Sequence, residues 1–225
     1  MSNSLKRLVE SWCPPPLAPW LRRAYRGVKY KPAGNSPQII QEAFRHYEQV
    51  GHATAGASPW WSRCREEMEF AISMMEDPVA AVRWAQNRIP FDHRMPVDQV
   101  GHLFELHAQT LAAEFPVYAD LVYKLGDSPF SRPDSLSRRG DRFLSNVFFW
   151  HLRTLLFCLT YVPRTNVVCE IGSGYGGLAR LWLSQRRKPV NTYILVDFPE
   201  SLFFAEVFLK LHNIEVRYVT SDNQL

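Results

Sequence analysis

The sequence predicts an α/β protein in which a helical N-terminal half precedes three strands of a parallel sheet. Apolar residues before residue 126 recur at helical spacing. After residue 165, short β-branched and apolar runs alternate with helical segments, which is typical of a parallel sheet with helical connections. A glycine-rich turn joins the first of these strands to the next helix.

The composition limits the class of protein. Of the 225 residues, 46% are hydrophobic and 21% are charged, which is ordinary for a globular protein. A net charge of +4 is too small to indicate nucleic-acid binding, so we expect no nucleic-acid partner. The four cysteines form no CxxC pair, which favours a reducing, cytoplasmic location.

Residues 1–37 are predicted to be a basic, aromatic arm. Seven basic residues stand against one acidic residue, Glu10, and aromatic side chains lie between them. One interpretation is a peripheral contact between residues 1–31 and an anionic membrane surface or partner, and the other is a solvated arm whose aromatic side chains pack on the main domain. The stretch after the first basic residues is too short and too polar for a signal peptide.

Residues 38–140 are predicted to be a helical region that ends in a loop. Asp77 precedes Pro78 as the N-cap of one helix. Residues 126–140 are rich in glycine, proline and serine, which is typical of a loop. The predicted helices are residues 37–50, 60–75, 77–87, 97–114 and 117–125.

The most apolar window, residues 143–162, belongs to a predicted helix over residues 142–161. Arg153 lies near its middle, and an arginine at the centre of a bilayer costs roughly 2.5–3.5 kcal/mol. We therefore expect a buried helix and no transmembrane segment. Pro163 ends the helix.

Residues 141–225 are predicted to hold a partial Rossmann-like core. Strand, helix, strand, helix and strand follow one another with short links, as in a doubly wound sheet. The first strand would lie at an open edge where a fourth strand normally pairs. The predicted strands are residues 166–171, 192–196 and 214–220, and the helices are residues 178–185 and 199–211.

The glycine-rich turn carries the first sign of a ligand. Gly172, Gly174 and Gly177 satisfy a GxGxxG pattern, and glycines let backbone N–H groups approach a ligand without interference from a Cβ atom. Glu170 precedes the turn at the end of the first strand. A carboxylate there opposes a pyrophosphate but suits a ligand with an ammonium and a sulfonium. Tyr175 either flanks the ligand or only covers the turn.

Acidic residues also follow the second and third predicted strands. Asp197 ends the second strand, where an acid can bond both ribose hydroxyls, and Asp222 follows the third, within reach of an adenine amino group. The carboxyl ends of parallel strands are where open sheets bind ligands. Three alternatives stay open: Glu170 as a buried structural acid, Asp197 as a helix cap and Asp222 as a turn residue.

These segments resemble a known family. The block EIGSGYGGLAR, residues 170–180, resembles motif I of class I methyltransferases that use S-adenosylmethionine (SAM). With FLSNVFFWHLRTLL and YILVDFPE, it is similar to the sugar O-methyltransferase family of bacterial polysaccharide gene clusters, over residues 140–222. The resemblance implies methyl transfer from SAM to a sugar or glycan acceptor. The implied cofactor-binding residues are Glu170, Gly172, Ser173, Gly174, Tyr175, Gly176, Asp197, Phe198 and Asp222.

The catalytic residues stay unassigned. A sugar hydroxyl is a poor nucleophile, so a general base or a metal ion is expected. His151 and Arg142 lie on the helix before the first strand, but a core or surface role is favoured for both. His102, Glu105 and His107 lack HExxH spacing, so no metal site is predicted.

Two other functions remain open. One is an NAD(P)-dependent oxidoreductase that binds a pyrophosphate at the glycines and a ribose at Asp197. The other is a non-catalytic helical interaction module with a degenerate Rossmann half. A class I core usually has seven strands, and the sequence up to Leu225 shows three. We therefore expect a truncated product or fragment with part of the cofactor site and little or no activity, and the oligomeric state has no sequence signal.

Overall fold

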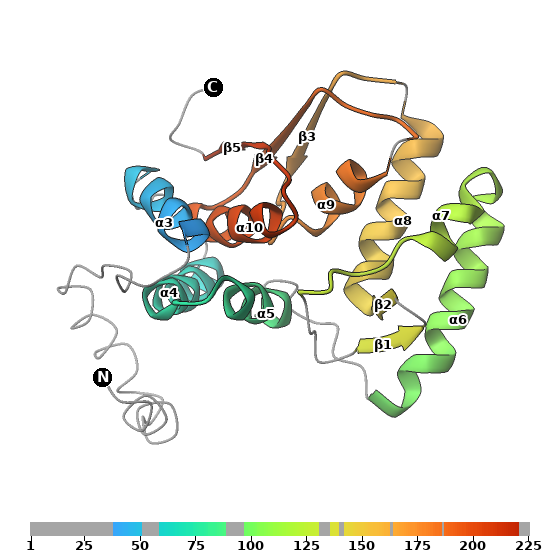
Figure 1. The fold of residues 1–225 in the computed structure, drawn as a ribbon, viewed down its shortest axis with the longest axis horizontal. Coiled ribbons are helices and arrows are strands. Elements are labelled where there is room, and N and C mark those ends of the chain that lie inside the picture. Colours follow the sequence, from blue (N-terminus) through green and yellow to red (C-terminus); the bar gives the residue numbers. More distant parts are fainter. Residues whose placement is uncertain are drawn as a thin grey trace. The chain divides into compact units, whose positions relative to one another are not determined.

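The computed structural model describes residues 38–50, 59–88, 97–130, 136–139, 142–162, 164–185 and 187–220 (Figure 1). The predicted arm, residues 1–37, and Asp222 lie outside the described residues. The elements are α3 (Gln38–Val50), α4 (Pro59–Met74), α5 (Pro78–Arg88), α6 (Val97–Glu114), a 3-10 helix η1 (Pro116–Tyr118), α7 (Ala119–Lys124), β1 (Leu136–Arg139), β2 (Arg142–Ser145), α8 (Asn146–Tyr161), β3 (Val167–Ile171), α9 (Gly177–Ser184), β4 (Thr192–Val196), α10 (Pro199–Leu211) and β5 (Arg217–Val219).

The fold is a mixture of helices and a small parallel sheet, which confirms the predicted α/β class. The sheet has the order β3-β4-β5, and both strand pairs are parallel. Val167 lies opposite Thr192 and Ile171 opposite Val196, so β3 and β4 are in register along their full length. The third strand is shorter than predicted, since it begins at Arg217 and not at residue 214.

The segment before α8 differs from the prediction. Residues 136–139, predicted as loop, and residues 142–145, predicted as the start of a helix, pair as the antiparallel strands β1 and β2. Helix α8 begins only at Asn146, because Ser145 is its N-cap. Ser145 has extended backbone angles, and its Oγ accepts the N–H of Phe148 at 3.0 Å. The predicted helical region therefore ends in a hairpin strand.

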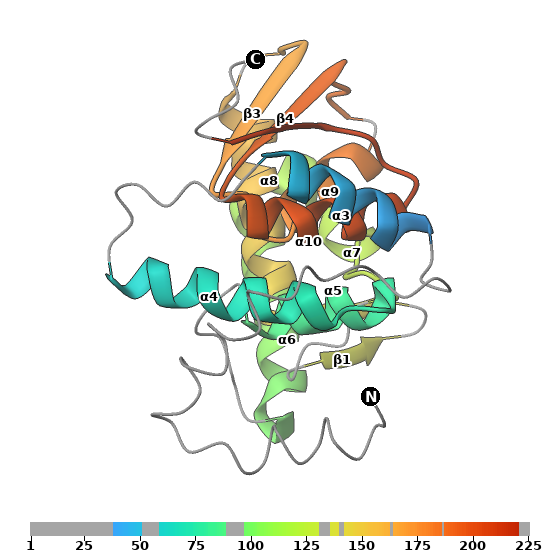
Figure 2. The same ribbon diagram turned by 90° about the vertical axis from the view of Figure 1, so that its left-hand side faces the viewer.

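Helix α10 is buried from Pro199 to Leu209. Its sequence is apolar on nearly all sides, as expected for a helix in the interior of a protein. It packs against α3, α4 and α5 (Figures 1 and 2). Phe204 stacks on Trp84 of α5 with ring centroids 5.0 Å apart, and Phe203 meets Tyr47 of α3 edge-on at 6.2 Å. The N-terminal helices therefore share one core with the helix that connects β4 to β5.

Helix α8 is the apolar segment singled out in the sequence. It packs between α6 and α9 (Figure 1). Its side chains Leu152, Leu155 and Leu156 are fully buried. It is thus a core helix, as predicted. Within the described ranges, no helix combines the length and the apolar character needed to cross a membrane.

The two faces of the sheet have different surroundings. Tyr193 and Leu195 of β4 point to one face and are 3% and 0% exposed. Val167 and Ile171 of β3 point to the opposite face and are 50% and 82% exposed. Among the described strands, β3 pairs only with β4, so its outer edge is open as predicted.

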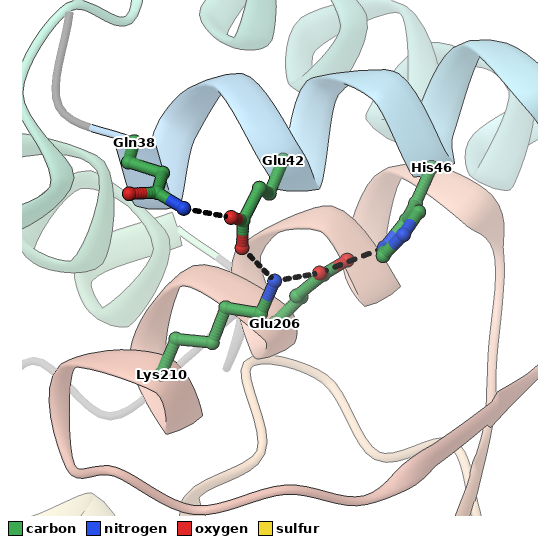
Figure 3. Close-up of polar contacts among 5 residues, drawn as sticks. All are labelled: Gln38, Glu42, His46, Glu206 and Lys210. Carbon is green, nitrogen blue, oxygen red and sulfur yellow. Dashed lines mark hydrogen bonds and ion pairs between the residues drawn. The ribbon is translucent and has the colours of Figure 1, made fainter.

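A polar cluster joins α3 to α10 (Figure 3). Lys210 Nζ lies 2.7 Å from a carboxylate oxygen of Glu42 on α3 and 2.7 Å from one of Glu206. His46 Nδ1 lies 2.8 Å from Glu206 Oε1, and Gln38 donates to Glu42. The Glu206 side chain is 4% exposed, and a desolvated carboxylate of this kind needs such partners.

Candidate functional site

The turn between β3 and α9 has the backbone geometry that its glycines predict. Gly172, Gly174 and Gly176 have φ angles of 75°, 55° and 82°, a region that favours glycine. The Gly172 N–H donates to the Val196 carbonyl at 2.8 Å, and the Gly176 N–H donates to the Ser173 carbonyl at 3.0 Å. The left-handed glycines are thus the ones at 172, 174 and 176, and not the Gly177 of the sequence pattern.

Asp197 links the end of β4 to this turn. Its Oδ2 accepts the N–H of Gly174 at 2.7 Å, and its Oδ1 accepts the N–H of Phe198 at 2.7 Å. Burial raises the pKa of Asp197, and these two N–H groups partly oppose the rise. Phe198, without a side-chain cap bond, is the N-cap of α10, so Asp197 is not a simple helix cap.

Glu170 lies one strand away on the covered face of the sheet. Its Oε2 accepts a hydrogen bond from the Tyr193 hydroxyl at 2.8 Å. Burial raises its pKa to about 7, the Tyr193 bond opposes this, and the nearby Asp197 adds to it. None of the groups that shift the pKa of Glu170 is cationic. A ligand with a positive charge beside Glu170 would therefore add an attraction that favours the ionised form.

The Tyr175 side chain points into the core. It is 3% exposed, and its ring meets His151 and Phe208 with centroids 5.7 and 5.2 Å away. Of the two sequence interpretations, the structure places this side chain as a cover for the turn. Any contact of Tyr175 with a ligand would therefore come from its backbone.

His151 of α8 lies against the first residue of α9. A Cβ atom at Gly177 would lie 2.3 Å from Cε1 and 2.4 Å from Nδ1 of this ring. Burial lowers the pKa of His151 to about 4, and Arg180 contributes to the shift, so the imidazole is neutral at pH 7. Of the core or surface roles that the sequence favoured, the structure gives this ring a packing role against Gly177 and Tyr175.

We expect Gly177→Ala to destabilise the protein by about 1–3 kcal/mol, because the added methyl group overlaps a buried ring. Urea unfolding of the wild type, Gly177→Ala, His151→Ala and the double variant would measure it. In the His151→Ala background the same change should cost less, because the overlapping ring is gone and only the Tyr175 hydroxyl, 2.9 Å from the Cβ position, stays close. A Gly177→Ala variant as stable as the wild type would contradict the packing described.

Sequence reasoning missed a buried polar network behind the turn. Arg180 of α9 donates to the Gly126 carbonyl at 2.6 Å. The Asp127 carboxylate next to it accepts the N–H of Ser128 at 2.7 Å and the hydroxyl of Ser145. Arg180 was part of the recognised motif block, but the partners come from a distant loop, so local sequence carries no signal for them.

Phe198 packs against α4. Its ring centroid lies 5.5 Å from that of Trp61 and 5.1 Å from the Arg65 guanidinium carbon. The side chain is half-buried, so one part of it stays available at the surface. Phe198 therefore connects the N-terminal helices to the segment that begins at Asp197.

The carboxyl edge of the sheet offers space and unpaired polar atoms. No atom lies within 4 Å of a Cβ placed at Gly172. The hydroxyls of Ser173 and Thr220 are buried and, within the described part of the chain, have no hydrogen-bond partner. Thr220 also lies at one end of a pocket of about 420 Å³, which is lined mainly by α3 and α10 and does not include the glycine turn or Asp197. These features fit a ligand with hydrogen-bonding groups at this edge.

The N-terminus of α9 has less room. The Cβ position of Gly176 lies 3.3 Å from Leu209 and that of Gly177 lies against His151. A pyrophosphate in a dinucleotide fold binds at such a helix N-terminus and needs close approach. The third glycine of the dinucleotide motif is also closely packed, so this packing does not distinguish the oxidoreductase alternative from SAM binding.

Metal ligands do not gather in the described residues: no three His, Cys, Asp or Glu side chains there are close enough to hold an ion. His107 of α6 instead packs edge-on against Phe149 at 5.5 Å. Comparisons of the chain with protein-family models, with curated proteins and with solved structures gave no match. The interpretation of the site therefore depends on its own geometry.

Proposed function

We propose that this chain binds SAM at the turn between β3 and α9 and serves methyl transfer to a sugar hydroxyl in polysaccharide biosynthesis. The observation that carries the proposal is the bond from the Gly174 N–H to the Asp197 carboxylate at 2.7 Å. It joins a left-handed glycine turn and an acid at the ends of two adjacent parallel strands, where open sheets bind nucleotides.

The charges at the turn support SAM over other nucleotides. A carboxylate has about four acceptor positions, and the N–H groups of Gly174 and Phe198 take two at Asp197. The Ser201 hydroxyl also bonds to this carboxylate, and the remaining acceptor position suits a ribose hydroxyl. Glu170 adds a second carboxylate near the turn, which suits an ammonium and a sulfonium and repels a pyrophosphate.

The protein's own contribution is to bind and orient. The N–H groups of Gly172, Gly174 and Gly176 already donate within the protein, so the donor that the turn offers the cofactor is the Ser173 hydroxyl, which has no partner among the described residues. When bound, SAM supplies a methyl group activated by its sulfonium. The sugar acceptor comes from the family resemblance alone, and no described residue is assigned as the general base.

Calorimetric titration with S-adenosylhomocysteine tests the proposal. We expect saturable binding to the wild type, weakened at least about tenfold by Asp197→Ala, because hydrogen bonds to a charged group contribute about 1.5–3 kcal/mol. Glu215→Ala, at an exposed carboxylate before β5, is the matched control and should not change the affinity. NADH binding in place of S-adenosylhomocysteine would overturn the proposal, and a folded protein that binds neither would support the non-catalytic module.

A further inference from the structure

One face of α4 contacts the segment that follows Asp197. Residues 61, 65 and 68 are spaced four and three residues apart, so their side chains share a helix face. The partners follow in the same order along the chain. Trp61 contacts Phe198 (5.5 Å between ring centroids), Arg65 contacts Glu200 (3.0 Å), and Met68 Sδ lies 3.8 Å from Ser201 Oγ.

The central contact is a buried ion pair. Arg65 Nε and Nη2 donate to the two carboxylate oxygens of Glu200, each at 3.0 Å. The two side chains are 7% and 0% exposed. Burial by itself lowers the pKa of Arg65, but Glu200 raises it overall, so the guanidinium stays protonated. A bidentate pair of this kind sets the orientation as well as the distance of its partners.

The Arg65–Glu200 pair lies next to Asp197, the acid of the proposed cofactor site. Glu200 is the second residue of α10 and three residues from Asp197. The Arg65 guanidinium carbon is also 5.1 Å from the ring centroid of Phe198, which directly follows Asp197 and is the N-cap of α10. Arg65 thus contacts both Phe198 and Glu200, in the segment where the chain passes from Asp197 into α10.

We propose that Arg65 is a positioning residue for the cofactor site: it holds the segment after β4 so that Asp197 accepts the Gly174 N–H. Its effect on cofactor affinity rests on the proposed function. Its effect on the Asp197–Gly174 bond does not, because that bond is present without a ligand.

A second cationic contact gives a matched control. Lys210 joins α10 to α3 through Glu42 and Glu206, near the C-terminal end of α10 (Figure 3). Removing this lysine also breaks a contact between α10 and an N-terminal helix, but far along α10 from Asp197. A general loss of stability should therefore appear in both variants, whereas a weaker bond between the Gly174 N–H and Asp197 should appear only in the Arg65 variant.

The test compares Arg65→Met, Arg65→Lys and Lys210→Met in the full chain. Amide hydrogen exchange of Gly174, measured by NMR relative to the amides of β4, reports the bond to Asp197 directly. We expect Arg65→Met to speed this exchange at least about tenfold and to weaken S-adenosylhomocysteine binding by a similar factor, as for loss of a hydrogen bond to a charged group. Lys210→Met is expected to destabilise the protein, because it removes a cation from the buried Glu206, but it should leave the affinity and the Gly174 exchange relative to β4 within about twofold, because Lys210 lies near the other end of α10.

Each outcome decides the proposal. Unchanged Gly174 exchange in Arg65→Met, or equal acceleration in Lys210→Met, would overturn it. If Arg65→Met does not fold, Arg65→Lys decides, because it keeps the charge but loses the bidentate geometry and should accelerate Gly174 exchange selectively. If the wild type does not bind S-adenosylhomocysteine while Gly174 exchange responds as expected, Arg65 is a positioning residue and the SAM proposal fails.

Discussion

Phe208→Ala should lower the free energy of unfolding by about 3–5 kcal/mol, as is usual for truncation of a fully buried phenylalanine. Phe208 is 0% exposed on α10, and its ring meets Tyr175 edge-on at 5.2 Å and His212 at 5.0 Å. The substitution leaves a cavity at the point where the glycine turn packs on the core.

Urea unfolding followed by tryptophan fluorescence would measure this loss. Phe157→Ala is the matched control, because Phe157 is 53% exposed on α8 and its truncation should cost less than about 1 kcal/mol. Similar losses for the two variants would contradict the placement of α10 at the centre of the core.

Stability should also depend on pH through two partly buried histidines. Burial, with a contribution from Arg180, lowers the pKa of His151 and of His212 from 6.5 to about 4. Between pH 4 and 6.5 the unfolded chain therefore binds a proton at each site that the folded chain does not. Each histidine makes stability fall by about 1.4 kcal/mol per pH unit as the pH drops through this window.

Glu170 acts in the opposite direction. Its pKa rises from 4.5 to about 7 on folding, so between these values the folded chain holds a proton that the unfolded chain has released. Its contribution to stability is present at low pH and is lost as the pH rises. In the wild type the effects of Glu170 and of the two histidines on the pH dependence of stability therefore partly cancel. Single substitutions separate these effects.

His212→Asn should reduce the slope of stability against pH by about 1.4 kcal/mol per unit, and Glu170→Gln should increase it by about the same amount. Urea unfolding at several pH values between about 4.5 and 6 measures both slopes within the windows set by the cited pKa values. Glu215→Gln, at an exposed carboxylate, is the control. Equal slopes in His212→Asn and the wild type would show that His212 is not held neutral by burial.

Much of the secondary structure was predictable because the signals are local. The run TYILV at Thr192–Val196 and the helices Val97–Glu114 and Pro199–Leu211 have the predicted bounds. Apolar periodicity, a proline at the first helical position and short β-branched runs depend only on neighbouring residues. Asp197 follows the second strand as expected, and because the carboxyl ends of adjacent parallel strands meet at one edge, its carboxylate lies at the glycine turn.

The antiparallel strands β1 and β2 were the main feature that the sequence-based prediction missed. Arg142–Ser145 is apolar enough to read as the first turn of α8, and serine marks an N-cap only once the start of the helix is known.

The sequence by itself determined the α/β class, the order of the strands and the residues at the glycine turn. Only the tertiary structure decided that His151 covers Gly177, that Tyr175 turns into the core and that Arg65 pairs with Glu200, 135 residues away. The physical reason is that local patterns specify backbone conformation and which face of an element is apolar. The partner of a buried charge or ring depends on how distant elements pack, and no spacing along the chain encodes that choice.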